Sequence, residues 1–579
     1  MSTFGFQCSP IKALLVILFL TICTYLGALW APFFWDDDVL IRDNTHIRTL
    51  EEPSRFFLNP FWELVSAEHK ERDKPNRHIM YRPLVMLSFA ADYKIYGTWA
   101  PGFHLTNLIL HLIVVTLVYS LALIILPKKD CEIAGVATCL FALHPALTQT
   151  VTWVSGRSDL LCALFVLFGI LAYRQCEKND RTYLGLFLAF LSMFMGLLTK
   201  EVAIVFPFLL LLTYTRPLAD KGRMLNLALS LFPALLFYGM LKRAAASGSP
   251  LWDYSQPLSV HLGLFVKGAT TFFRYLLRWL HPFNLRLSYP ELAKPEFSYG
   301  TFDVLLFFLL FGLILRALLS HESQHCHSIA LFWFILPLAP VANLFLFRGL
   351  WTQYAERYLY LPATFLFLSP LCLLGQWLHQ REQWRAIVGK GLLAIIVIFG
   401  LLTMQRNALF QEPHLLWQAE LAAFAENQEA MANLAITLCR MGRPEQGLVH
   451  LRRLCELNPK NTLAWNNRLM AAVDSGQEEE ARTAFVKLRQ LVPQAVMPAL
   501  NYCLLLIRLG EFSQGRELME EVLAKQPENG RALKQLAICL LEEKRPKEAR
   551  KVLLRLLTLY PEDKDARKLV AATGAPLTH

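Results

Sequence analysis

The sequence predicts an all-α protein in which a membrane domain with many spans precedes a solenoid of repeated helix pairs. Its 579 residues are 55% hydrophobic, with a mean hydropathy of +0.36, which is too apolar for an ordinary soluble protein of this size. Apolar runs long enough to cross about 30 Å of hydrocarbon recur between residues 11 and 404. Beyond residue 411 the sequence is charged and periodic, which is typical of a solenoid.

We divide the chain into a membrane domain (1–410), a connecting helix (411–427) and a repeat domain (428–579). The first apolar segment, 11–31, has no clean small-residue cleavage site, so we expect it to remain as a span. Ten further candidates bring the expected number of crossings to eleven. They are 102–127, 131–151, 159–175, 182–199, 202–216, 224–241, 302–319, 328–347, 358–377 and 386–404.

The segment 260–282 is apolar but is not counted as a span. Lys267, Arg274, Arg278 and His281 fall on one face of a helix, which predicts an amphipathic helix lying in the membrane interface. This basic face either anchors the chain to anionic headgroups or guides the phosphate of a substrate. With eleven crossings, and the basic connections on the cytoplasmic side, the loop 31–101 and the repeats fall on the outer face.

Charge and cysteine content limit the function classes. Of the net charge of +11, only +2 lies beyond residue 411, which favours membrane lipids or an anionic substrate as partners and argues against nucleic acid. The twelve cysteines include no CxxC pair, so no zinc site or disulfide framework is indicated. The tract 321–327 contains metal-ligand residue types, but a solvated cytoplasmic loop is its simpler interpretation. We expect no cofactor, and no residue pattern supports a divalent metal.

Three consecutive carboxylates, Asp36, Asp37 and Asp38, follow the first span. Charged groups at the mouth of a membrane span are costly and indicate a functional site, although a solvated acidic loop is the alternative. Further polar residues are expected on the same outer face, where each alone could be a helix-packing group or a structural ion pair. They are Arg82, His104, Asn107, His111, His144, Arg157, Asp159, Lys200, Glu201, Glu356 and Arg357.

The repeat domain keeps a strict register. Pro459, Pro493, Pro527 and Pro561 are equally spaced, and a helix-closing proline with a period of about 34 residues is the signature of the tetratricopeptide repeat. Gly442, Gly476 and Gly510 have the same spacing, with Lys544 in the fourth position. We place four repeats at 428–461, 462–495, 496–529 and 530–563, followed by a short cap at 565–573.

Amide side chains recur in this register on the first helix of each repeat. Asn433, Asn467 and Asn501 are one repeat apart, and Gln535 follows at the same spacing. On the concave face of a solenoid such a ladder could hydrogen-bond an acceptor peptide. A structural role within the array is the alternative.

Six motifs in order resemble one known family. They are WDDDVLIRDN, YRPLVMLSF, GFHLTNLILH, LHPALTQTVTWVSGRSDLL, LLTKEVA and ERYLYLPATF. In this order, and followed by tetratricopeptide repeats, they resemble the transmembrane and tetratricopeptide-repeat O-mannosyltransferases and their bacterial relatives. More distantly, the layout is similar to other glycosyltransferases of the GT-C fold.

The resemblance implies a GT-C-like membrane glycosyltransferase that takes a sugar from a polyprenyl- or dolichyl-phosphate donor. The family's acidic pair maps onto Asp36 and Asp37, and Asn44 matches an asparagine downstream of it. Asp38 stands where relatives vary. The short chain and single repeat array look more like the bacterial relatives, which would place the active site and repeats in the periplasm, or in the lumen of the endoplasmic reticulum for a eukaryotic protein.

Glycosyl transfer to a hydroxyl needs a base and cations. A carboxylate within hydrogen-bond reach can take the acceptor proton, so Asp36 or Asp37 is the expected base. Departure of a lipid phosphate needs positive charge where the negative charge accumulates. Arg82, Arg157, Lys200 and Arg357 are the candidate ligands of that phosphate.

We therefore expect an enzyme that transfers a hexose such as mannose to a serine or threonine hydroxyl of a protein, with the repeats presenting this acceptor to the outer face. A non-catalytic membrane scaffold that gathers assembly factors is one alternative. The other is a ligase or polymerase that acts on lipid-linked glycans.

Overall fold

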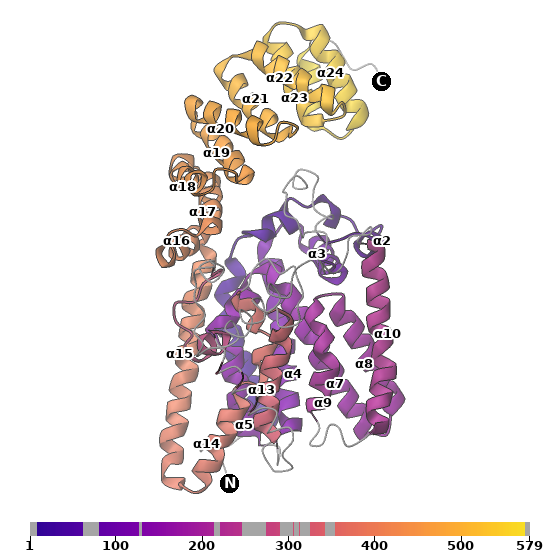
Figure 1. Ribbon diagram of the computed structural model, residues 1–579, viewed down its shortest axis with the longest axis vertical. Helices are drawn as coiled ribbons and strands as arrows, with labels where there is room; N and C mark the ends of the chain where they lie inside the picture. Colours follow the sequence, from indigo (N-terminus) through magenta and orange to yellow (C-terminus); the bar gives the residue numbers. More distant parts are fainter. Residues whose placement is uncertain are drawn as a thin grey trace. The chain divides into compact units, whose positions relative to one another are not determined.

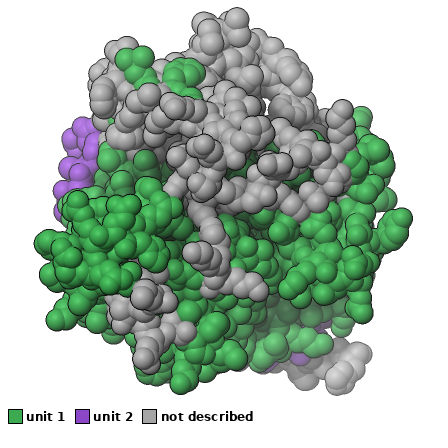
Figure 2. Space-filling view, turned by 90° about the horizontal axis from the view of Figure 1, so that it is seen from below, with its two compact units in different colours: residues 1–413 green, residues 414–579 purple. Residues whose placement is uncertain are grey.

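The computed structural model describes residues 9–61, 80–126, 130–213, 221–245, 274–289, 325–341 and 354–573, together with 305, 308 and 312. It divides into two compact units, residues 1–413 and 414–579, which Figure 2 colours separately. Every regular element in the described part of the chain is helical, as Figure 1 shows. The predicted all-α class is therefore confirmed.

The helices of the first unit form a bundle around one large apolar core. Its helices are α1 (Pro10–Tyr25), α2 (Ser54–Leu58), α3 (Pro83–Tyr96), α4 (Ala100–Ile125), α5 (Cys131–Ala142), α6 (Thr148–Thr152), α7 (Arg157–Lys178), α8 (Thr182–Leu197), α9 (Phe206–Leu212), α10 (Lys221–Ala245), α13 (His325–Val341), α14 (Leu368–His379) and α15 (Arg385–Gln411).

Five helices are long and apolar enough to cross a membrane: Pro10–Trp30, Ala100–Ile125, Val154–Lys178, Met224–Ala245 and Glu382–Gln411. Their outer surfaces expose large apolar side chains, such as Ile11, Phe19 and Leu401, at 60% or more. Water would oppose this exposure, but hydrocarbon tolerates it. The chain is a multi-pass membrane protein. Five or six spans are found among the described residues, so the expected count of eleven is not confirmed, and the candidate at 302–319 lies almost wholly outside them.

Two of the expected spans are broken by proline. The predicted span 131–151 is a pair of helical segments, Cys131–Ala142 and Pro145–Thr152, bent by 51°. His144 has an extended backbone, because the residue before a proline is disfavoured in the α conformation. The predicted span 358–377 begins with two short 3-10 turns, Glu356–Leu359 and Pro362–Phe365, and becomes α-helical only at Leu368.

The described part of the expected loop 31–101 is a folded cap rather than an open loop. After Phe34 comes a π-helical turn, Asp38–Arg42, and then a 3-10 turn, Thr45–Ile47. Ile41, Ile47 and Phe56 are fully buried, and they pack with α3 in a second apolar core. Residues 62–79 of this loop lie outside the described part.

Polar side chains of α15 tie it to other helices of the first unit. Asn407 Nδ2 donates to Thr24 O at 3.0 Å, and Asn407 Oδ1 accepts from Thr152 Oγ1 at 2.6 Å. Thr403 Oγ1 donates to Leu143 O at 2.7 Å. A hydrogen bond in a water-poor interior has no solvent competitor, so these contacts fix α15 against α1 and the bent pair.

The second unit consists of helix pairs with short turns between them. Each expected repeat contains one pair, and a last helix follows where the cap was expected. They are α17 (Gln428–Arg440), α18 (Pro444–Leu457), α19 (Thr462–Ser475), α20 (Glu478–Leu491), α21 (Met497–Leu509), α22 (Phe512–Lys525), α23 (Gly530–Glu542), α24 (Pro546–Leu559) and α25 (Lys564–Ala572), preceded by α16 (Pro413–Ala423).

Candidate active site

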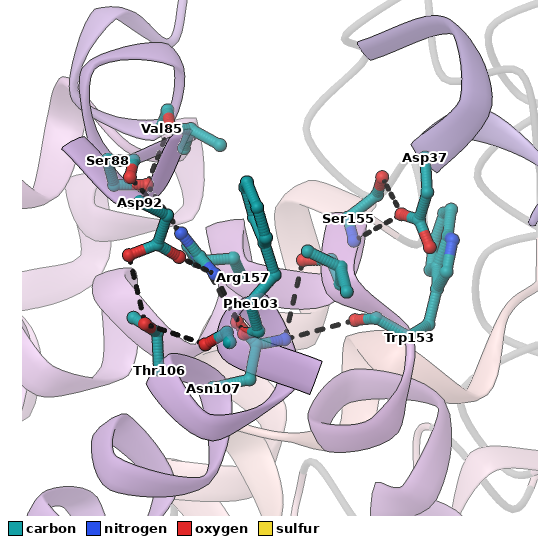
Figure 3. Close-up of polar contacts among 12 residues, drawn as sticks. Asp37, Val85, Ser88, Asp92, Phe103, Thr106, Asn107, Trp153, Ser155 and Arg157 are labelled. Carbon is teal, nitrogen blue, oxygen red and sulfur yellow. Dashed lines mark hydrogen bonds and ion pairs between the residues drawn. The ribbon is translucent and has the colours of Figure 1, made fainter. Parts of the chain in front are cut away.

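Three segments that are far apart in the sequence converge at one end of the first unit. They are the turn after α1 that contains Asp37, the connection between α6 and α7, and the 3-10 turn Glu356–Leu359. Asp37 Oδ1 accepts hydrogen bonds from both the amide nitrogen of Ser155, at 2.8 Å, and its hydroxyl. Figure 3 shows Ser155 and Asp37 facing each other across this contact.

The Asp37 carboxylate is fully buried, and its two oxygens differ. Oδ1 holds the two bonds from Ser155, whereas Oδ2 has no hydrogen-bond partner among the described residues. Burial raises the pKa of Asp37 to about 8, against the lowering effect of the Ser155 bonds, and Asp38 and Asp36 raise it further. Asp37 Oδ2 therefore remains available as a hydrogen-bond acceptor, and the carboxyl group has a pKa close to neutral pH.

The neighbouring carboxylates have other roles. Asp38 is buried and forms an ion pair with Arg42 at 2.8 Å, one turn along the chain. Asp36 is half-buried and lies within electrostatic range of Arg357. Asn44 caps the next turn by accepting from His46 N at 2.9 Å and donating to Leu40 O at 3.0 Å. Asp38 and Asn44 therefore shape the loop around Asp37.

A buried network fixes the turn that contains Ser155 (Figure 3). Asn107 on α4 donates to three carbonyl oxygens of this turn, those of Val151, Trp153 and Val154, at 3.2–3.4 Å. Its Oδ1 accepts from Arg157 Nε at 2.8 Å. The position of Ser155 is thus determined by a side chain in the core of the helix bundle.

Arg157 belongs to this network rather than to an accessible surface. It is fully buried, and Nη2 pairs with Asp92 Oδ2 at 2.6 Å and donates to Phe103 O at 3.0 Å. Its Nη1 faces the carbonyl and hydroxyl oxygens of Ser88. Because all three nitrogens donate to protein acceptors, we leave Arg157 out of the proposed phosphate site.

Arg357, which is far from this turn in the sequence, also lies against it. Its guanidinium carbon is 5.4 Å from the ring centroid of Trp153 and 5.0 Å from that of Tyr358. The Trp153 ring also stacks on Trp35, with centroids 4.6 Å apart and planes 18° from parallel. A half-buried cation and two aromatic rings therefore lie beside the Asp37 segment.

The candidates Lys200 and Arg82 occupy two further ion pairs. Lys200 Nζ lies 2.5 Å from Asp159 Oδ1 and 4.7 Å from the ring centroid of Tyr358. Tyr358 directly follows Arg357 in the sequence. Arg82 Nη2 lies 3.5 Å from Glu201 Oε2, and Lys242 approaches the other oxygen of this carboxylate at 3.9 Å. The structure therefore brings Lys200 close to Arg357, while Arg82 and Lys242 share the carboxylate of Glu201, which follows Lys200 in the chain.

Glu356 is buried in a structural ion pair. Its Oε2 lies 2.5 Å from Arg406 Nη1 on α15, and its Oε1 accepts from Arg286 N at 2.7 Å and from the Tyr289 hydroxyl. Breaking a buried ion pair by removing one partner typically costs about 3–5 kcal/mol. Glu356 therefore joins distant segments instead of contacting a substrate.

The three candidate histidines are also buried. His111 bonds to the Tyr360 hydroxyl at 2.7 Å and to Ala142 O at 3.2 Å. His144 bonds to Trp279 O at 2.9 Å and stacks on that ring at 3.6 Å. His104, on the same face of α4 as Asn107, lies 2% exposed. These histidines are thus packed inside the helix bundle.

The structure adds residues that sequence reasoning did not select. Ser155, Asp92, Trp35 and Trp153 complete the site, and Arg406 completes the ion pair of Glu356. One signal was available for Asp92, since a lone carboxylate in the apolar stretch Leu84–Tyr96 requires a partner.

The structure covers two other sequence predictions only in part. Lys267 of the basic face lies outside the described residues, whereas 274–280 is helical, and Arg278 Nη1 donates to Phe283 O at 3.2 Å. Residues 321–324 of the histidine tract are also outside, and His325 begins α13. Within the described ranges, no cluster of three or more His, Cys, Asp or Glu side chains could hold a metal.

In the repeats, the amide ladder is largely used internally. Asn501 is buried and bonds to Asn466 Oδ1 at 3.1 Å, and Gln535 Nε2 donates to Leu500 O at 3.0 Å. Asn433 is half-buried, and the Nδ2 of Asn467 is buried with no partner among the described residues. Only the first two positions of the ladder therefore stay candidates for peptide contact.

A separate groove of about 670 Å³ lies between α18, α19 and α20. Its lining combines apolar and basic side chains, namely Trp465, Val486, Arg468, Arg482 and Lys487. The guanidinium of Arg468 lies 4.8 Å from the Trp465 ring centroid and also pairs with Glu480 at 2.5 Å.

Comparison with known proteins agrees with this architecture. Residues 506–573 match a family model described as "Tetratricopeptide repeat". Among curated proteins, human "Protein O-mannosyl-transferase TMTC3" is 23% identical over 96% of this chain and 65% of its own length. Mouse "Protein O-mannosyl-transferase TMTC4" is 26% identical over 76% of this chain and 66% of its own. The resemblance to this O-mannosyltransferase family is confirmed. The chain spans slightly under two thirds of the length of these relatives.

Two solved structures align with parts of the chain. An apo oligosaccharyltransferase from Archaeoglobus fulgidus aligns over 73% of this chain and 58% of its own, with a TM-score of 0.39 and 13% identity. The Thermus thermophilus tetratricopeptide-repeat protein TTC0263 aligns over 29% of this chain and 93% of its own, with a TM-score of 0.25 and 21% identity.

Proposed function

We propose that this protein is an integral-membrane glycosyltransferase of the GT-C type. It transfers a hexose such as mannose from a polyprenyl- or dolichyl-phosphate donor to a serine or threonine hydroxyl of a protein. Its relatives are named protein O-mannosyl-transferases, and the chain combines membrane-spanning helices with tetratricopeptide repeats. The active site lies on the periplasmic or luminal face.

The observation that most supports this proposal is the buried, half-satisfied carboxylate of Asp37. Its Oδ1 is held by Ser155, so Oδ2 remains to accept the proton of the acceptor hydroxyl. In the transfer, a bond forms between the acceptor oxygen and the anomeric carbon, and the bond from that carbon to the phosphate oxygen breaks. The proton passes to Asp37, and the lipid phosphate leaves as an anion.

The leaving phosphate requires positive charge on the other side of the sugar. Arg357 fits this role because its guanidinium lies over Trp153, two residues before Ser155. Lys200, whose ammonium group pairs with Asp159, adds a second positive charge beside Tyr358. The cluster of Arg82 and Lys242 would hold a more distant part of the donor headgroup.

Substitution of the three aspartates tests the proposal. We expect Asp37→Asn to lower the rate of hexose transfer by about 10²–10⁴-fold, the usual contribution of a positioned base. Asp38→Asn removes the charge that pairs with Arg42, so it should lower the folding stability more than the turnover of the folded enzyme. Asp36→Asn should have an intermediate effect on transfer through Arg357.

The readout is the intact mass of periplasmic or luminal proteins from cells that express each full-length variant. A hexose-sized mass increase that requires the gene would identify both the reaction class and the acceptor. Correctly inserted Asp36→Asn and Asp37→Asn proteins that both transfer at the wild-type rate would refute the proposal. A polymeric glycan product would instead favour a ligase or polymerase, and a scaffold would produce no mass change at all.

A further inference from the structure

A stacked pair of indole rings, Trp35 and Trp153, lies beside both the proposed base and the proposed phosphate ligand and is called the aromatic plate. Trp153 belongs to the same turn as Ser155, which binds Asp37, and its ring stacks on Trp35 at 4.6 Å. The guanidinium of Arg357 also lies over the Trp153 ring, at 5.4 Å, which is a cation–π distance. The plate thus connects the two charged groups that a transfer reaction must separate by one sugar ring.

The backbone of Trp35 is strained, which indicates that its surroundings hold the indole ring in place. Its φ is +57°, and for a bulky side chain the left-handed region costs about 1–2 kcal/mol. Such strain persists only where the surroundings determine the conformation, and it is frequent at ligand sites. Trp35 is half-buried, whereas Trp153 is 3% exposed, so Trp35 forms the accessible side of the plate.

Two buried polar atoms at the plate lack a protein partner. Trp153 Nε1 is a hydrogen-bond donor and Asp37 Oδ2 an acceptor, and neither finds a partner in the part of the chain that the structure describes. Leaving a buried polar group unsatisfied costs about 1–3 kcal/mol. A hydroxyl group can serve either atom, because it donates one hydrogen bond and accepts others.

We propose that Trp35, Trp153 and Arg357 form the subsite for the glycosyl phosphate head of the donor. The sugar ring lies against the indole plate, one of its hydroxyls accepts from Trp153 Nε1, and its phosphate pairs with Arg357. Asp37 Oδ2 then faces the acceptor hydroxyl on the opposite side of the anomeric carbon. This inference rests on the proposed function and assigns the part of the site that recognises the sugar.

The chemistry of the plate distinguishes a sugar from the other parts of the donor. A polyprenyl chain has no oxygen to accept the Trp153 hydrogen, and a phosphate alone would need the cation but not the plate. A pyranose has an apolar C–H face that can pack on an indole, together with hydroxyls at its edge. The aromatic face is negative and attracts the polarised C–H groups of such a ring.

Two lipid ligands test this assignment. The experiment measures how tightly the full-length chain in nanodiscs binds a mannosyl polyprenyl phosphate and the same polyprenyl phosphate without the sugar. We expect the wild type to bind the glycosylated lipid more tightly. Trp153→Phe keeps a ring and removes Nε1–H, and it should reduce this preference about five- to tenfold, the effect of one hydrogen bond. Affinity for the sugar-free lipid should not change.

Trp35→Ala removes the accessible side of the plate and should reduce the preference further, whereas Arg357→Gln should weaken the binding of both lipids by a similar factor. Trp384→Phe is the matched control, because Trp384 is 44% exposed in a separate 3-10 turn, and it should behave as the wild type.

The outcomes separate this inference from the proposed function. A wild-type preference for the glycosylated lipid that both Trp153→Phe and Trp35→Ala retain would overturn the sugar subsite and leave the transferase proposal intact. An equal loss of affinity for both lipids in Trp153→Phe would also overturn the sugar subsite. A wild type that binds the two lipids equally would overturn the subsite, and one that binds neither lipid would overturn the proposed function as well.

Discussion

The protonation state of Asp37 results from two opposing effects on one side chain. Burial raises its pKa to about 8, although Ser155 stabilises the carboxylate through two hydrogen bonds. Asp36, Asp38 and Arg157 are the charged groups that act on it. If Asp37 is the base, it must be ionised, so turnover should rise with pH and level off above about pH 8.

Removal of the Ser155 hydroxyl tests this balance. In Ser155→Ala the carboxylate loses one hydrogen bond but keeps the one from the amide nitrogen, so the pKa of Asp37 should rise. A hydrogen bond to a charged group contributes about 1.5–3 kcal/mol, and one pH unit corresponds to about 1.4 kcal/mol. The acidic limb of the kcat profile should therefore move up by about one to two pH units, measured as transfer rate from about pH 6 to 10.

Ser155→Thr keeps an oxygen in this place and should restore the wild-type profile. Ser192→Ala, a buried serine on α8, is the control for the general effect of deleting a hydroxyl. If Ser155→Ala lowered turnover equally at every pH, Ser155 would support the fold without affecting the proton acceptor.

Single residues also show which parts of the candidate site could be predicted from the sequence. The triple aspartate pointed to the candidate site, because its position after a span is unusual. The sequence did not show that Arg157 pairs with Asp92 and donates a hydrogen bond to Asn107, because that network joins three helices. Nor could it show that Glu356 is paired with Arg406, which lies on a helix much later in the chain. Charged residues at span ends look alike in a sequence until their partners are known.

Among the structural elements, the repeats were predicted more completely than the spans. A fixed period repeats the same helix ends, so one correct assignment fixes the others. The membrane spans have no such register, and hydropathy does not detect a break. His144–Pro145 and Pro362 interrupt apolar runs without making them less apolar, and this is why two predicted spans are not continuous helices.

The ends of the first helices in the repeats lead to a prediction about stability. Gly442, Gly476 and Gly510 adopt φ of +69° to +79°, and Lys544 adopts +60° in the same position. At all four, the next amide bonds back to a carbonyl five residues earlier, as in Arg545 N to Leu540 O at 2.9 Å. A non-glycine residue in this region is strained by about 1–2 kcal/mol, so the fourth repeat has a suboptimal cap.

We expect Lys544→Gly to stabilise the fourth repeat by about 0.5–1 kcal/mol, because the relief of strain exceeds the about 0.4–1 kcal/mol lost to greater freedom of the unfolded chain. Hydrogen exchange of α23 and α24 amides in the full-length protein measures this free energy of opening. Lys551→Gly, at an exposed position inside α24, should instead destabilise by about 1 kcal/mol. A loss of protection in Lys544→Gly would contradict the strain argument.

At the scale of the whole molecule, the two units have separate apolar cores. The cores of the first unit lie within residues 1–413, and those of the repeats lie within 414–579. Every side chain of the proposed donor site belongs to the first unit, whereas the groove and Asn467 belong to the second. This separation implies that donor binding and acceptor binding can be changed independently.

We therefore expect a chain that ends at residue 413 to bind the glycosylated lipid as tightly as the full-length protein. Its kcat/KM for the intact protein acceptor should fall at least tenfold, mostly through KM, because a second contact on a linked domain raises the effective concentration of the acceptor. Transfer to a short peptide that contains only the modified serine or threonine should be unchanged, and this comparison controls for damage to the first unit. Equal kcat/KM of the two chains on the intact acceptor would show that the repeats do not present it.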